Sequence, residues 1–181
     1  MSGHNKWSKI KHKKAASDAE KSKIFGKLSL LITQESKKAG GDASAPGVRA
    51  AVEKAKEMNM PADNIDRAIK KGAGADAGNM EEVLYEAYGP GGVALIVTGL
   101  TDNKNRTAQE VKHALTKHGT ALAGSGAAIW NFEKIGSDWK ANSTIPVSEN
   151  DLEVLEKLIE TLEDLDDIQG VYSNVNEEEE I

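Results

Sequence analysis

The chain has 181 residues, no cysteine, eight aromatic residues and a formal net charge of −6. This length suffices for a mainly aliphatic core, whereas the lack of cysteine excludes disulfides and thiolate metal sites and favours a reducing cytoplasm. The longest strongly apolar run, residues 93–97, is too short to cross a bilayer, and no apolar segment follows the basic N-terminus as in a signal peptide. We therefore expect a cytoplasmic protein with no membrane partner, whose mature chain starts at Met1.

Positive charge is concentrated near the N-terminus. Residues 1–72 contain 16 Lys/Arg against 8 Asp/Glu, a net charge of +8, and residues 73–181 contain 7 against 21, a net charge of −14. A lysine-rich segment attracts polyanions such as phosphate backbones. Because the Debye length is about 8 Å at physiological salt, distant acidic residues do not cancel this local attraction. Nucleic acid is therefore the first partner that the sequence predicts.

The first part of the chain predicts a basic arm followed by a three-helix bundle. Residues 1–16 are lysine-rich and lack clean periodicity, and the sequence Ser-Asp-Ala-Glu at 17–20 has the form of a capping box that opens a helix. Apolar residues at helical spacing then cover residues 17–38, 46–58 and 61–72. We expect a bundle over residues 17–72.

The rest of the chain predicts a separate α+β domain over residues 80–176, after a small, flexible linker at residues 73–79. The predicted strands cover residues 83–88, 93–98, 128–134 and 168–175, and the predicted helices cover residues 105–117 and 149–164. This order resembles a ferredoxin-like α/β sandwich, in which helices cover one face of an antiparallel sheet. Residues 177–181 are an acidic, solvated tail.

Four blocks of sequence carry a resemblance to a known family. The first is Gly-His-Asn-Lys-Trp-Ser-Lys-Ile-Lys-His-Lys-Lys at residues 3–14, and the others are residues 60–72, 85–107 and 162–167. Together they resemble the YebC/PmpR family of bacterial regulators, whose mitochondrial relatives activate translation of a cytochrome oxidase subunit.

The resemblance also implies that a domain is missing. Family members usually carry a third domain inserted between the third strand and the last helix, whereas here residues 134–138 lead almost directly to the segment before that helix. We expect this inserted domain to be absent near residues 135–138. Gly136-Ser137 fits either a designed linker or natural shortening of the chain.

The arm provides the main candidate site. Its candidate phosphate contacts are Lys6, Lys9, Lys11, Lys13 and Lys14. Trp7 and His12 are candidates for stacking on a base, although Trp7 also fits an anchor that fastens the arm to the fold.

Two further groups of basic residues extend this candidate interface. Arg67, Lys70 and Lys71 lie within about one turn of the third predicted helix, where they fit either phosphate contacts or a solvated helix end. Lys104 and Arg106 lie in a polar loop that opens a helix, where an anion is favoured. A capping box of Thr107 and Glu110 explains part of that motif by helix initiation alone.

Catalytic and metal sites are not predicted. The four histidines lack a shared face, no nucleophile has a base at a recognisable spacing, and the turn at residues 89–92 leads into a strand and not into the helix that a phosphate loop requires. We expect no enzyme activity, cofactor or small-molecule substrate.

We expect a non-enzymatic, nucleic-acid-binding regulator of gene expression that acts as a monomer. The resemblance implies either DNA binding in transcription, or association with the ribosome and its RNA to help synthesis through polyproline-type stalls. The residues slightly favour RNA, because we find no base-reading helix and no heptad seam for a dimer. The alternative is a protein-binding adaptor that uses the acidic C-terminal half, which has a net charge of −12 over residues 138–181.

Overall fold

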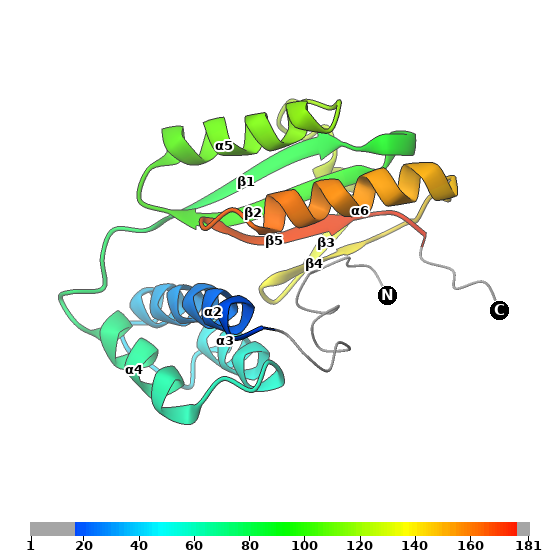
Figure 1. The fold of residues 1–181 in the computed structure, drawn as a ribbon. Coiled ribbons are helices and arrows are strands. Elements are labelled where there is room, and N and C mark those ends of the chain that lie inside the picture. The colour runs from blue at the N-terminus through cyan, green and yellow to red at the C-terminus, as the bar shows by residue number, and fades with distance from the viewer. Residues whose placement is uncertain (1–16, 177–181) are drawn as a thin grey trace. The chain divides into compact units, whose positions relative to one another are not determined.

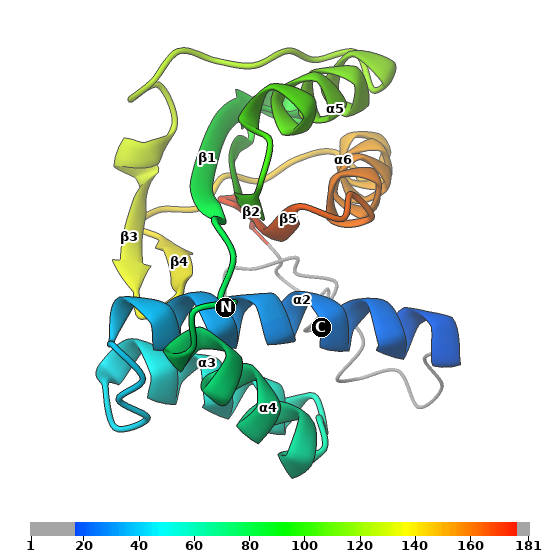
Figure 2. The same ribbon diagram turned by 90° about the vertical axis from the view of Figure 1, so that its left-hand side faces the viewer.

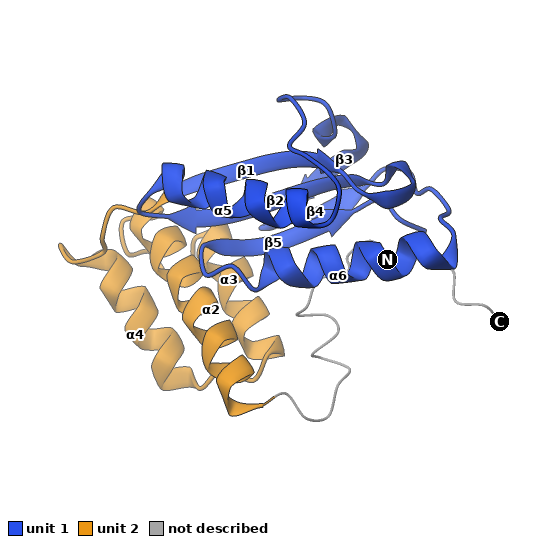
Figure 3. Ribbon diagram, turned by 45° about the horizontal axis from the view of Figure 1, so that its top comes forward, with its two compact units in different colours: residues 1–8, 82–181 blue, residues 9–81 orange. Residues whose placement is uncertain are grey.

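The computed structural model describes residues 17–176, so the basic arm and the acidic tail lie outside the described residues. The described chain forms two compact units, residues 17–81 and residues 82–176 (Figure 3). The first unit is helical and the second combines helices with β-sheets. The α+β class predicted from the sequence is therefore confirmed.

The helical unit contains α2 (Asp18–Lys38), α3 (Pro46–Glu57) and α4 (Ala62–Ala73) (Figure 1). The predicted capping box at the start of α2 is confirmed. The Glu20 backbone N–H donates to Ser17 Oγ at 3.3 Å, and the Ser17 backbone N–H donates to Glu20 Oε2 at 2.9 Å. Two backbone donors that the helix itself leaves unsatisfied are thereby paired.

Helices α2 and α4 approach each other closely because small residues line their contact. Ser36 Oγ donates to the carbonyl of Ile69 at 2.7 Å, and Thr33 Oγ1 donates to the carbonyl of Ala68 at 3.2 Å. A Cβ atom on Gly72 would lie only 2.5 Å from Ser36 Cβ, so this position requires glycine. The contact fixes α4, which carries three of the candidate basic residues.

The second unit is built on a three-stranded sheet with the order β1-β2-β5. Its elements are β1 (Glu81–Tyr88), η1 (Pro90–Gly92), β2 (Ala94–Thr101), α5 (Lys104–Lys117), η2 (Ile129–Asn131), β3 (Phe132–Ile135), β4 (Asp138–Ala141), α6 (Glu149–Glu163) and β5 (Ile168–Ser173). The short 3-10 turn η1 joins β1 to β2, as expected, and β2 pairs with β5 antiparallel.

Alternate residues of β2 face two different apolar layers. Leu95 and Val97 pack in a core with residues of α5 and α6, which cover one face of the sheet. Ala94 and Ile96 face the opposite layer, which contains Phe132 and residues of β4. Figure 2 shows α5 and α6 on one side of the sheet and β3 and β4 on the other. The unit therefore has three layers.

The predicted third strand, residues 128–134, was wrong in its extent and its pairing. Strand β3 does not join the main sheet but pairs antiparallel with β4, with Ile135 opposite Asp138. The two residues between them form the turn, and Gly136 has a φ of 62°, as glycine has at the first central position of a tight hairpin turn. Gly136-Ser137 is thus a hairpin turn, and the sheet has three strands where four were expected.

Candidate nucleic-acid interface

The predicted arm contacts lie outside the described residues. They are Lys6, Trp7, Lys9, Lys11, His12, Lys13 and Lys14. The described candidates are on α4 and at the N-terminus of α5, in the two separate units.

Helix α4 places its three candidates on exposed positions. These candidates are Arg67, Lys70 and Lys71, and all three are exposed. The two lysines follow Arg67 by three and four residues, so each lies on the same side of the helix as Arg67. Arg67 Nε donates to the backbone carbonyl of Asp63 at 3.2 Å, and Arg67 Nη2 donates to the side-chain amide oxygen of Asn64. Both acceptors are neutral, so the guanidinium keeps its net charge on the helix surface.

The N-terminus of α5 is capped by a residue that the sequence analysis did not choose. Asn103 Oδ1 accepts from the Arg106 backbone N–H at 3.1 Å, and the helix begins at Lys104. The predicted capping box of Thr107 and Glu110 was therefore wrong. Asn is preferred at the N-cap position at least as strongly as Thr, so Asn103 can cap the helix in place of Thr107.

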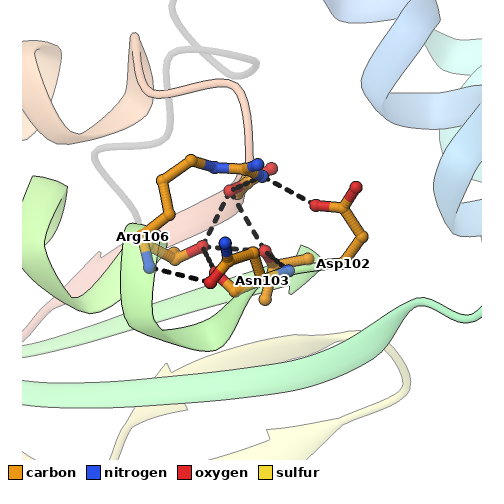
Figure 4. A network of polar contacts seen from close by, with 6 residues as sticks. Asp102, Asn103 and Arg106 are labelled. Carbon is orange, nitrogen blue, oxygen red and sulfur yellow. Dashed lines mark hydrogen bonds and ion pairs between the residues drawn. The ribbon is translucent and has the colours of Figure 1, made fainter.

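Arg106 is held by two carboxylates (Figure 4). Its Nη2 donates to Asp102 Oδ1 at 2.8 Å and to Asp167 Oδ2 at 2.9 Å. The hydrogen bonds that Arg106 donates to Asp167 and to Asp102 raise its pKa. A phosphate that binds Arg106 must compete with both carboxylates. Lys104 is exposed at the first position of the helix.

Asp167 accepts hydrogen bonds from the end of β2 and from the start of α5. Its Oδ2 accepts from Thr107 Oγ1 at 2.7 Å and from Thr101 Oγ1 at 3.2 Å, besides Arg106. Burial alone would raise the pKa of Asp167, but the bonds from Arg106, Thr107 and Thr101 outweigh it and lower the pKa. The network ties the end of β2 and the start of α5 to the residue that precedes β5.

A second polar cluster, which the sequence analysis did not find, holds the loop before η2. Glu86 on β1 is buried, and its carboxylate accepts from the backbone N–H groups of Gly126 and Ala128 at 2.7 Å and of Ile129 at 2.8 Å. Burial raises the pKa of Glu86, and the three backbone donors together more than reverse this and lower it. The available signal was one acidic residue within the otherwise apolar and aromatic run of residues 83–88.

Two exposed aromatic side chains, Tyr88 of β1 and Trp130 of η2, donate to the carbonyl of Ala127 in the same loop. Trp130 Nε1 donates to the carbonyl of Ala127 at 2.9 Å, and the Tyr88 hydroxyl donates to that same carbonyl. Trp130 was assigned to a predicted strand, where it would alternate between faces, but it lies in the turn η2.

Comparisons with known proteins agree with this architecture. Residues 5–75 match the family described as "TACO1/YebC protein N-terminal domain", and residues 80–138 and 135–175 match "TACO1/YebC second and third domain". The chain belongs to the TACO1/YebC family. The resemblance noted from the sequence is thereby confirmed.

Individual relatives support this membership. A "Probable transcriptional regulatory protein" of Fervidobacterium nodosum is 40% identical over 235 residues, covering 96% of this chain and 93% of the relative. One with the same name from Petrotoga mobilis is 57% identical over 138 residues, which cover 75% of this chain but only 55% of that relative. The crystal structure of a conserved hypothetical protein of Aquifex aeolicus superposes with a TM-score of 0.80 at 35% identity, covering 97% of this chain and 98% of that one.

Some relatives contain residues that this chain lacks. The match to the Fervidobacterium nodosum protein extends over 235 residues and exceeds the 181 residues of the chain. The match to the second and third family domains is also split, and its two segments meet at residues 135–138. These are the residues of the turn between β3 and β4. We propose that the family's third domain would enter at this turn, where no core residue is interrupted.

Within residues 17–176, no helix combines the length and apolar character needed to cross a membrane. In the same part of the chain, no three His, Cys, Asp or Glu side chains are grouped so that they could hold a metal ion.

Proposed function

We propose that this protein is a non-enzymatic, nucleic-acid-binding regulator of gene expression. The observation that carries the proposal is the separation of charge along the chain, with a net charge of +8 over residues 1–72. Such a density of lysine and arginine supports sequence-independent attraction to phosphates. The names of the relatives, "Probable transcriptional regulatory protein", support the regulatory part of the proposal.

The proposed interface consists of the arm lysines together with Arg67, Lys70 and Lys71 of α4. The three α4 residues are exposed, and the hydrogen bonds of Arg67 go to neutral acceptors, so a phosphate can be bound without breaking an ion pair. Lys104 at the start of α5 is a further candidate. The protein would act in the cytoplasm and as a monomer.

This function has two possible targets, ribosomal RNA in translation and duplex DNA in transcription, and we favour RNA. A reader of the major groove presents free Asn, Gln or Arg side chains from one helix. On α4 the Asn64 and Arg67 side chains bond to each other, which leaves this helix suited to backbone contacts. Ribosomal RNA, including a role at polyproline-type stalls, is therefore our first choice of target, and promoter DNA is our second.

Charge reversal in the arm tests the proposal. Lys11, Lys13 and Lys14 would be replaced by Glu, and the control would replace the exposed Lys112, Lys117 and Lys157 of the second unit, which changes the net charge equally. We expect the arm variant to lose binding to both single-stranded RNA and duplex DNA, and the control to keep it. For about six neutralised phosphates, log affinity of the native protein should fall with log salt at a slope near −5 for a duplex and −4 for a single strand.

Ribosome co-sedimentation beside a DNA mobility-shift assay, on the same preparation, separates the two targets. Equal binding by the arm variant and the native protein would overturn the proposal.

A protein-binding adaptor is the second candidate, and the acidic surface of α6 favours it. Exposed acidic side chains of this helix include Glu149, Glu153 and Glu160. An adaptor that used this surface would keep its partner when the arm is reversed and lose it when these three residues become Gln. The two substitutions therefore distinguish the two functions.

A further inference from the structure

Trp130 is exposed to an extent that is unusual for a large aromatic side chain. Its exposed fraction is 68%, the highest among the exposed large apolar residues of the described chain, and Tyr88 beside it on the same carbonyl is 37% exposed. Indole rings normally bury most of their surface, because this burial is a large source of stability. An exposed ring that is also held in place points to a contact with a ligand.

The backbone around Trp130 is fixed on both sides. Before it, the Glu86 carboxylate binds the N–H groups of Ala128 and Ile129. After it, the Asn142 backbone N–H donates to the carbonyl of Asn131 at 2.7 Å, and the Asn142 side-chain amide donates to the carbonyl of Trp130 at 3.4 Å. The ring is therefore positioned before any ligand arrives, which reduces the entropy lost on binding.

The polar atoms of both rings are already used. The indole N–H and the Tyr88 hydroxyl donate to one acceptor, the carbonyl of Ala127, so the rings offer mainly their apolar faces. Aromatic grooves that bind proline-rich peptides commonly also donate a hydrogen bond to the peptide. A nucleobase needs only a face on which to stack, and every base has one.

The charge around the rings permits a phosphate backbone to approach. Residues 118–148 contain two acidic residues, Glu133 and Asp138, and two lysines, Lys134 and Lys140, so the segment carries no net charge from these groups. The Glu86 carboxylate adds one negative charge beside this segment, but it is buried and its oxygens accept hydrogen bonds from three backbone N–H groups. The acidic surface of α6 lies across the sheet, on the side opposite β3 and β4 (Figure 2). A polyanion bound on the hairpin side thus avoids the acidic helix within this unit.

We propose that Tyr88 and Trp130 form a stacking platform for an unpaired base of single-stranded nucleic acid. The inference rests on the proposed function and deepens it, because it assigns contact with the bases to the second unit and attraction to the phosphates to the arm and α4. It also favours RNA regions with unpaired bases as the target.

The test measures binding of the full chain to a fluorescent oligouridine of about 12 nucleotides, and to an abasic strand of equal length and charge. Loss of one stacked base weakens binding by about 1–3 kcal/mol, which corresponds to about 5-fold to 150-fold. We expect Trp130→Ala to weaken binding of oligouridine by a factor in this range and to leave the abasic strand unaffected. Trp130→Phe should retain most of the affinity, since it keeps a ring.

Ile135→Ala is the matched control, because Ile135 is an exposed apolar residue of the β3–β4 hairpin that follows η2 and lies outside the platform. It should bind oligouridine as the native protein does. Circular dichroism and thermal unfolding would verify that each variant is folded.

Each outcome distinguishes the two proposals. If the native protein binds oligouridine through its arm lysines but Trp130→Ala binds equally well, the platform is refuted and the proposed function stands. If Trp130→Ala weakens binding of oligouridine and of the abasic strand equally, base stacking is also refuted. If the native protein binds neither strand, both proposals fail.

Discussion

Arg67 of the helical unit and Arg106 of the sheet unit are the same residue type in opposite electrostatic settings. Arg67 bonds to a carbonyl and an amide, and its charge stays uncompensated by those acceptors. Arg106 bonds to Asp102 and Asp167, so that the three side chains together carry a net charge of −1. A basic residue in a sequence motif that suggests phosphate binding is therefore no evidence of such binding until the hydrogen-bond partners of its side chain are known. We propose that in this protein the first arginine binds phosphate and the second serves the fold.

Asp167→Ala should produce the largest effect on the fold. Only 13% of the Asp167 side chain is exposed, and its loss would leave the donors Thr101, Thr107 and Arg106 without their shared acceptor. We expect the free energy of unfolding to fall by about 2–3 kcal/mol, measured by urea denaturation. The matched control is Asp102→Ala, because Asp102 is 67% exposed and should change stability by less than about 0.5 kcal/mol. Equal losses for the two variants would contradict the role given to Asp167.

Glu86→Gln should have a smaller and pH-dependent effect. The amide would turn an N–H₂ group toward at least one of the three backbone donors, and we expect a loss of about 1–2 kcal/mol at pH 7. Because the folded state lowers the pKa of Glu86, its carboxylate contributes stability above the ordinary glutamate pKa, and this contribution is lost as the pH falls through the lowered value.

The difference in unfolding free energy between native protein and Glu86→Gln should therefore shrink on acidification. Urea denaturation at a series of pH values measures it. A difference that grows as the pH falls would show that the neutral form of Glu86 is the stabilising one.

The sequence was sufficient where the determining interactions are local. The capping box of Ser17 and Glu20 spans three residues, and it was predicted and confirmed. In contrast, Arg106 donates to Asp167, which lies 61 residues further along the chain, and no local sequence pattern indicates this pairing. The resemblance to a family with an inserted domain led us to interpret Gly136-Ser137 as a junction, and so β4 was missed although the hairpin turn has the residues that such turns prefer.

The salt dependence of oligouridine binding tests the central claim most directly. Replacing Arg67, Lys70 and Lys71 with Gln removes three charges from exposed positions of α4. We predict that the slope of log affinity against log salt becomes shallower by about 2, since each phosphate contact to a single strand contributes about 0.7, and that Arg106→Gln leaves the slope unchanged. An unchanged slope for the α4 variant, or an equal decrease for Arg106→Gln, would contradict the proposal that α4 binds phosphates and Arg106 serves the fold.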